Sequence, residues 1–223
     1  MRTTESNGTT YVSVTSAMRL VKTLLGEPED YFGPLGNIHA AEGEGCHRVC
    51  LDWLASTHYG MPAVEPPAKP EIHPDQDRWD AVLRSSLFRF QEFVKDYKVE
   101  PIGIEQADFS KIYGLVGHID LPAYFTIPGR MRMKGPIDLK FTSAILESHK
   151  LQARCYGKLD GMKGSQLGGI FWCPRDRDVW KFEPVNLNAN LTDVMAVSYA
   201  AKLWAWGEKK KEVQWIRSVK NTY

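Results

Sequence analysis

Two segments, GLVGHID from Gly114 to Asp120 and GPIDLKF from Gly135 to Phe141, flank a loop rich in Pro, Gly and Arg. In the second segment apolar residues alternate with polar ones, so the two-residue period of a strand places Asp138 and Lys140 on the same face. A hairpin between the two segments would bring Asp120 beside them. The sequence therefore predicts a small site that contains two carboxylates and one ammonium.

Such a trio suits the hydrolysis of a phosphodiester with a divalent metal ion. Paired carboxylates and water supply the oxygen ligands that Mg²⁺ prefers, and a nearby lysine can orient the attacking water or offset charge on the phosphate. The alternative interpretation is a surface salt bridge across a hairpin, because the pattern Asp-x-Lys alone is common.

Two helical segments supply further polar residues. In ESHKLQARCYGKLDGM, from Glu147 to Met162, apolar residues recur at helical spacing, and Gln152 and Tyr156 fall one turn apart on an adjacent face. Upstream, AEGEGCHRVCLDWL carries His47 beside an apolar stripe. Neutral imidazole is a common metal ligand, so His47 is a candidate for the same site.

In this order, the four motifs resemble the RecB-like exonuclease branch of the PD-(D/E)XK nuclease superfamily. The motifs are the segment from Gly43 to His47, Gly117-x-x-Asp120, Asp138-x-Lys140 and Gln152-x-x-x-Tyr156. The opening YVSVTSAM is similar to the start of phage exonucleases and of the mitochondrial genome maintenance exonuclease in that branch. The resemblance runs from about Tyr11 to the last helix, and its strength lies in the order and spacing of motifs that are weak singly.

The resemblance implies a fold and a set of roles. The fold would be a three-layer α/β/α restriction-endonuclease-like core, with a mixed sheet of about five strands flanked by helices. His47, Asp120, Asp138 and the carbonyl of Leu139 would hold two Mg²⁺ or Mn²⁺ ions per site. Lys140 would assist the nucleophile. Gln152 and Tyr156, which match the last motif, would support the residues that bind metal.

Two positions depart from the family pattern, and one histidine competes with His47. Phe141 follows the lysine where threonine is common, and His118 stands where a small residue is usual. Neither change removes a ligand, so they bear on substrate preference more than on activity. His39 is the rival metal histidine, but Gly43 lies four residues before His47 as the family pattern requires, which favours His47.

Composition indicates one globular domain covering residues 1–223. The chain is 43% hydrophobic and 25% charged, and it is long enough for one sizeable core. The formal net charge of +1 excludes a global basic field, so contact with nucleic acid needs a local cluster. Basic residues do gather around the candidate site in the sequence, and four of them are candidate DNA contacts: Arg130, Arg132, Lys150 and Arg154.

The cysteine pattern bears on whether the protein holds an iron–sulfur cluster, and the hydropathy bears on its cellular location. Four cysteines without a close-spaced group near the C-terminus favour buried free thiols over an iron–sulfur cluster. No signal sequence and no run of about 18 apolar residues is present, so we expect a soluble intracellular protein, in a bacterial or phage-infected cytoplasm, with no membrane partner.

The remaining elements follow from periodicity and from Gly and Pro positions. Helices are expected over Ala17–Leu25, around His47, over Arg78–Tyr97, and over Leu191–Trp206 with a stop at Gly207. A strand is expected over Val99–Gln106 and a hairpin over Ile170–Phe182. Gly60–Pro74 is an exposed proline-rich connector, with an edge of the substrate groove as the alternative. Glu105 is expected to be structural, with a third acid that binds metal through water at the margin of the site as the alternative. Trp204 and Trp206 are expected in the core, although they could instead stack on bases.

These observations predict a metal-dependent deoxyribonuclease. We expect an exonuclease that acts at DNA ends, favours single strands and serves replication, repair or recombination, with a single-strand-binding or annealing protein as a possible partner. No phosphate loop of a helicase motor is present. The alternatives are a structure-specific endonuclease of the same fold and a catalytically inactive nucleic-acid-binding module. Adjacent carboxylates that repel each other without a cation argue against the inactive module.

Overall fold

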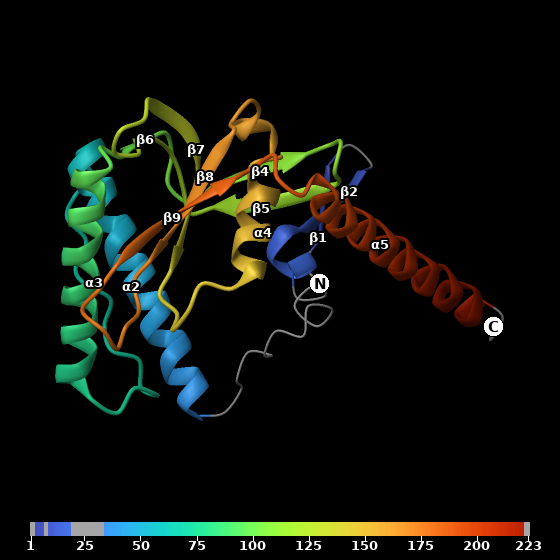
Figure 1. Ribbon diagram of the computed structural model, residues 1–223. Coiled ribbons are helices and arrows are strands. Elements are labelled where there is room, and N and C mark those ends of the chain that lie inside the picture. Colours follow the sequence, from blue (N-terminus) through green and yellow to red (C-terminus); the bar gives the residue numbers. More distant parts are fainter. Residues whose placement is uncertain (1–2, 7–8, 19–33, 221–223) are drawn as a thin grey trace.

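The computed structural model describes residues 3–6, 9–18 and 34–220, and it contains two sheets and several helices (Figure 1). The strands of the larger sheet lie in the order β3-β6-β7-β8-β9. The strand bounds are β3 Glu100–Pro101, β6 Leu121–Thr126, β7 Arg132–Lys140, β8 Leu167–Trp172 and β9 Lys181–Asn186. The β7–β8 pair is parallel and the other pairs are antiparallel. The expected mixed α/β fold with a five-stranded sheet is therefore confirmed.

Helices cover both faces of this sheet, as a three-layer α/β/α core requires. On one face, α2 (Pro34–Tyr59) and α3 (Gln76–Asp96) pack with Phe93, Leu139 and Phe171 in the largest buried cluster. On the other face, α4 (Glu147–Tyr156) packs through Ala153 on Ile170 (Figure 1). The chain between β7 and β8 contains α4 and a 3-10 turn, Asp160–Met162, and it makes the crossover that parallel strands need.

The second sheet was not predicted from the sequence. Its order is β1-β2-β5-β4, with β1 Thr3–Ser6, β2 Thr9–Ser13, β5 Leu115–Ile119 and β4 Gln106–Ser110. A separate buried cluster joins this sheet to α4 and to α5 (Leu191–Lys220), and it contains Val12, Ile119, Leu151 and Val194. Of the helix expected over Ala17–Leu25, a helical stretch over 14–18 is seen, and residues 19–33 lie outside the described part of the chain.

The predicted hairpin between the GHID and GPIDLKF segments is wrong in its first strand. The chain bends at Asp120, and β6, which pairs with β7, begins only at Leu121. The physical reason is that Ile119 packs in the second cluster while Leu121 packs in the first. Because two residues so close in sequence enter different cores, β5 and β6 belong to different sheets.

Two other expected elements and the expected position of one tryptophan also differ from the structure. Of the strand predicted over Val99–Gln106, β3 keeps only Glu100–Pro101. The last helix continues through Gly207 to Lys220, because one helical glycine costs only about 1 kcal/mol. Trp206 is 62% exposed and is therefore not a core residue. The hairpin predicted over Ile170–Phe182 is confirmed as β8 and β9.

Candidate functional site

The candidate site lies where β7 extends beyond the start of β6. The last β6–β7 pair joins Leu121 to Ile137, so the next backbone N–H of β7 that points toward β6 meets no strand. That N–H belongs to Leu139, and it donates to Oδ2 of Asp120 at 2.8 Å. Asp120, at the bend between the two sheets, thus completes the hydrogen bonding of β7 with its side chain.

Alternation along β7 places Asp138 and Lys140 opposite the apolar face. Asp138 pairs in register with Ile170, which faces α4, whereas Leu139 packs toward α2 and α3. The Lys140 ammonium donates to Oδ1 of Asp138 at 2.8 Å and lies 2.7 Å from Oδ2. Asp138 is only 1% exposed, so the alternative of a salt bridge at the protein surface does not fit.

His47 reaches this cluster from α2. Its Nε2 lies 3.3 Å from Oδ2 of Asp120, and its Nδ1 lies 3.7 Å from Oε1 of Glu105. Glu105 is mostly exposed and has a backbone φ of 46°, a left-handed conformation that non-glycine residues seldom adopt. Glu105 therefore lies at the margin of the site.

Helix α4 closes the site from the side of the second core. Gln152 Nε2 donates to the hydroxyl of Tyr156 at 2.8 Å, and the side chain of Thr15 also hydrogen-bonds Tyr156. A Cβ atom added to Gly117 would lie 2.8 Å from Cε1 of Tyr156, so the ring packs against the bare backbone of β5. The glycine of the GHID motif therefore provides room for the tyrosine. Thr15 was not among the site residues predicted from the sequence.

Burial and charge set the protonation of the site. Burial raises the pKa of Asp138 to about 7, with the charge of Lys140 opposing the rise and that of Asp120 adding to it. Burial also acts to raise the pKa of Asp120, but hydrogen bonding and charge from His47, with Lys140 and the Leu139 N–H, hold it below its usual range.

For the two basic groups of the site, burial acts to lower the pKa and the neighbouring carboxylates raise it. Burial would lower the pKa of His47, but the hydrogen bond and charge of Asp120 raise it above the ordinary value. Burial also works against the charged form of Lys140, yet the carboxylates of Asp138 and Asp120 raise the lysine pKa. For Tyr156, burial and the same two carboxylates raise the phenol pKa, so the hydroxyl stays protonated.

The donor atoms present fit a hard divalent cation held partly by water. His47 and Asp120 are in contact here, and the charge of Asp138 acts on Asp120 from β7. Oδ2 of Asp138 is buried, lies 2.7 Å from the Lys140 ammonium and has no other partner among the described residues. Mg²⁺ commonly uses only one or two protein carboxylates and keeps several waters. Within the described ranges, no three His, Cys, Asp or Glu side chains are gathered closely enough to form a ready-made metal cage.

Other predicted site residues lie away from this cluster. His118 is exposed on β5, where it pairs in register with Ala107 of β4. Arg132 pairs with Glu100 and stacks on Tyr124 near the start of β7, which places it about 20 Å along the strand from Asp138 at ~3.3 Å per residue. Arg130 lies in the exposed turn just before it. These two arginines are therefore not brought to the site.

The other two candidate DNA contacts lie on α4. Lys150 is half-buried and forms an ion pair with Glu147 at 2.7 Å. Arg154 is also half-buried, and its Nε finds no hydrogen-bond partner among the described residues. Both residues lie on α4, the helix that also carries the site residues Gln152 and Tyr156.

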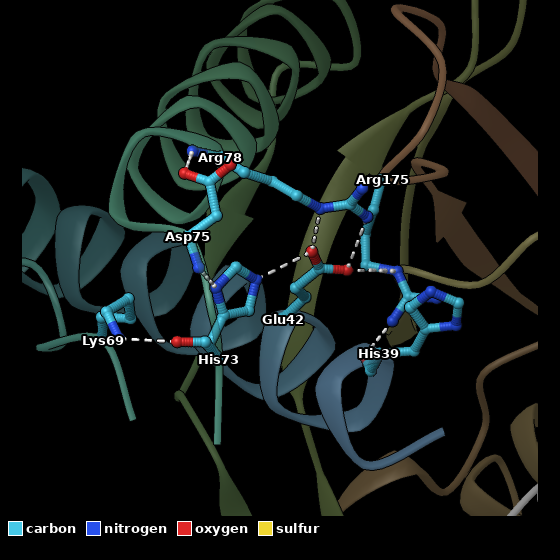
Figure 2. Close-up of polar contacts among 7 residues, drawn as sticks. All are labelled: His39, Glu42, Lys69, His73, Asp75, Arg78 and Arg175. Atoms are coloured by element: carbon cyan, nitrogen blue, oxygen red, sulfur yellow. Dashed lines mark hydrogen bonds and ion pairs between the residues drawn. The ribbon is translucent and has the colours of Figure 1, made fainter. Parts of the chain in front are cut away.

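The rival histidine, His39, belongs to a different cluster (Figure 2). It is exposed in the first turns of α2, eight residues before His47 and so about 12 Å along the helix. Its carbonyl accepts a hydrogen bond from Arg175 in the β8–β9 loop. The structure therefore brings His47, and not His39, to the paired carboxylates.

The cluster of Figure 2 is centred on the fully buried carboxylate of Glu42. Arg78 Nε donates to Oε1 of Glu42 at 2.7 Å, His73 Nε2 lies 3.1 Å from the same oxygen, and Arg175 Nε lies 3.9 Å from Oε2. Burial acts to raise the pKa of Glu42, but the hydrogen bonds and charges of its partners hold it below the usual value. The cluster ties α2 to α3, to the β8–β9 loop and to the end of the proline-rich segment.

That proline-rich segment is mostly exposed, as expected, but it is anchored at two points. His73 is fully buried against Glu42, and the carbonyl of Pro67 accepts a hydrogen bond from Trp79 at 3.0 Å. A groove of about 590 Å³ runs along α2 beside His47, and Met61 is the residue of the segment that lines it. Glu44, Asp52 and Glu105 make the groove acidic on balance, with Arg48 opposing them.

All four cysteines are buried, as the sequence indicated, and none forms a disulfide: Cys46, Cys50, Cys155 and Cys173. Burial raises the pKa of the Cys46 thiol to about 12. Among the described residues no helix is both long and apolar enough to cross a bilayer.

Comparison with known proteins gives little guidance. No protein-family model matches the chain, and no curated protein matches it. A solved structure titled "Crystal structure of SSO0001" is 12% identical, with 86% of this chain and 84% of that chain covered and a TM-score of 0.35. A similarity this weak carries no argument about function.

Proposed function

We propose that the chain is a metal-dependent deoxyribonuclease that hydrolyses phosphodiester bonds at DNA ends. The observation that supports the proposal most is the meeting of His47, Asp120, Asp138 and Lys140 at one sheet edge. These residues come from α2, the β5–β6 bend and β7, and they form the ordered motif set that resembles RecB-like nucleases.

The energetics of the cluster favour a binding role over a purely structural one. A buried ion pair seldom stabilises a fold more than apolar residues of similar size, because desolvation offsets the attraction. Here burial raises the pKa of Asp138, and repulsion from a second carboxylate, Asp120, adds to the rise. A bound divalent cation would relieve that repulsion, which gives the arrangement a physical reason to exist.

The roles then follow from donor chemistry. His47, Asp120, Asp138 and the carbonyl of Leu139 would hold Mg²⁺ or Mn²⁺, which when bound polarises the phosphate and lowers the pKa of a water molecule. His47 must be neutral to act as a ligand, so its raised pKa makes metal binding weaker as pH falls.

The other residues act on the substrate and on water. Lys140 carries its charge against Asp138, where it can hydrogen-bond a water molecule or a phosphate oxygen. The hydrogen bond between Gln152 and Tyr156 fixes the orientation of the phenol, which lies near both carboxylates and remains a donor. Lys150 and Arg154 on α4 would contact the phosphate backbone.

The groove beside His47 indicates how a strand would lie. Its acidic lining disfavours phosphates, so the backbone would pass over α4 and the uncharged bases would occupy the groove, where Tyr59 offers an aromatic surface. Contacts of this kind read little sequence and depend strongly on salt.

The test is a cleavage assay on linear and circular DNA, single- and double-stranded, labelled at either end, with Mg²⁺, Mn²⁺ or chelator. We expect metal-dependent loss of nucleotides from linear single strands and much weaker attack on circles. His118→Ala is the matched control, because His118 is exposed away from the cluster, and it should cleave like the wild type. Absence of cleavage with either metal would refute the proposal, and equal nicking of circular single strands would replace the exonuclease by an endonuclease.

A further inference from the structure

The solvent-facing side of α5 is apolar over its first four and a half turns. From Leu191 to Gly207 the sequence contains only two charged residues, Asp193 and Lys202. Five large apolar side chains between 39% and 68% exposed follow one another at helical spacing: Leu191, Met195, Tyr199, Leu203 and Trp206. We call these five residues the α5 stripe.

The α5 stripe is separate from the face that attaches the helix to the protein. Val194, Val197 and Ala201 are buried in the second core, and Ser198 donates to the carbonyl of Tyr113. The helix then extends away from the rest of the molecule (Figure 1). A helix that is apolar on both faces is normally covered on both. The α5 stripe is therefore unusual for a helix that faces water.

Small residues lie beside the large ones on the same face. At 100° per residue, Thr192, Ala196, Ala200 and Gly207 each lie next to a member of the stripe around the helix. A Cβ atom built on Gly207 would meet nothing within 4 Å, so this side of the helix is open. The face thus carries a ridge of large side chains next to a shallow track of small ones.

We propose that the α5 stripe is the interface with a second copy of this chain, in which two α5 helices pack antiparallel around a two-fold axis near Tyr199. A two-fold rotation places the ridge of one helix on the track of the other, so the face is complementary to itself. The face carries almost no charge that would select a different partner. Its one lysine, Lys202, instead donates to the carbonyl of Ile112 at 3.2 Å.

The exposed area also suits a dimer. At about 200 Å² for each large apolar side chain, the exposed fractions of the stripe correspond to roughly 500 to 600 Å². The small residues between them and the 76% exposed Ile112 beside the helix bring the patch toward the ~800 Å² per partner of a stable interface.

The first test measures self-association by sedimentation velocity over a range of protein concentrations. The wild type should reach about twice the chain mass of 25.3 kDa. Leu203→Glu, at a position 68% exposed, should weaken the dimer about 100-fold with an unchanged circular dichroism spectrum. Val64→Glu is the matched control, because Val64 is 49% exposed in the proline-rich segment, and this variant should dimerise like the wild type.

The second test measures orientation by oxidative crosslinking, since the four native cysteines are buried. Tyr199→Cys lies on the proposed axis and should form a disulfide-linked dimer. Leu191→Cys should not, because its symmetry mate would lie about 24 Å away along the antiparallel helices. A wild type that stays monomeric at every concentration, including one that binds lipid vesicles as a monomer, would overturn the proposal. So would a dimer unaffected by Leu203→Glu. Neither readout depends on nuclease activity.

Discussion

Replacing Asp138 by asparagine should make the metal-free protein more stable at alkaline pH while abolishing cleavage. The substitution keeps the shape of the side chain and removes a charge that is 1% exposed. In the wild type, burial and the charge of Asp120 raise the pKa of Asp138 to about 7, although Lys140 opposes the rise. The folded protein therefore holds a proton on Asp138 over a pH range in which the unfolded chain has lost it.

The sign and size of the effect follow from this difference. A folded pKa near 7 against an ordinary value of 3.8 means that the stability present below pH 4 is lost as pH rises through 7. Each pKa unit corresponds to 1.36 kcal/mol, so the full loss is roughly 4 kcal/mol. Because the asparagine variant also deprives Lys140 of its partner, the net advantage should be smaller, roughly 2 kcal/mol between pH 5 and pH 8.

The assay is urea unfolding followed by tryptophan fluorescence, with chelator, from pH 5 to pH 8, for wild type and Asp138→Asn. We expect the free energy of unfolding of the variant to rise relative to wild type as pH increases. Excess Mg²⁺ should stabilise the wild type and leave the variant nearly unchanged. Cleavage by the variant should fall at least ~100-fold. Parallel stability curves, or cleavage at the wild-type rate, would show that Asp138 is not a strained metal ligand.

Three further substitutions test the site and its supports. Lys140→Ala should lower turnover by roughly 100-fold, with little change in the Mg²⁺ affinity measured by calorimetry, because an ammonium has no lone pair for a metal. A variant that loses Mg²⁺ affinity but keeps normal turnover per bound metal would contradict this role. Gly117→Ala should cost ~1–3 kcal/mol and displace the Tyr156 ring, visible in its NMR signals, since the new Cβ would lie 2.8 Å from that ring. Glu42→Gln should cost ~1.5–3 kcal/mol at pH 7, because the half-exposed Arg78 and the mostly buried Arg175 lose the carboxylate that they pair with. Because the pKa of Glu42 is lowered, this difference should shrink as pH falls below the ordinary Glu value of 4.5, and a pH-independent difference would refute it.

Local periodicity was sufficient to predict much of the site. The alternation in β7 correctly separated Asp138 and Lys140 from Leu139, and the helical spacing correctly paired Gln152 with Tyr156. These patterns need only the geometry of one element, which the sequence specifies directly. The nuclease assignment itself stays a prediction.

Features that depend on tertiary packing could not be predicted in the same way. The bend at Asp120 arises because Ile119 and Leu121 enter different cores, although both are apolar and two residues apart, as in one continuous strand. The strands β1 and β2 are short, and they are stabilised by pairing with each other and with the distant β5. Whether Arg132 approaches the site depends on the strand register of β7. The position of Arg132 in a basic cluster of the sequence does not reveal that register.

The hydrogen bond from the Leu139 amide to Asp120 gives the protein a built-in spectroscopic reporter. A backbone N–H that donates to a carboxylate at 2.8 Å is in a charge-assisted bond, so its proton resonance should appear far downfield. Any cation that draws charge from Asp120 weakens this bond and moves the resonance upfield. A single amide signal would thus follow occupancy of the site in solution without substrate, label or turnover.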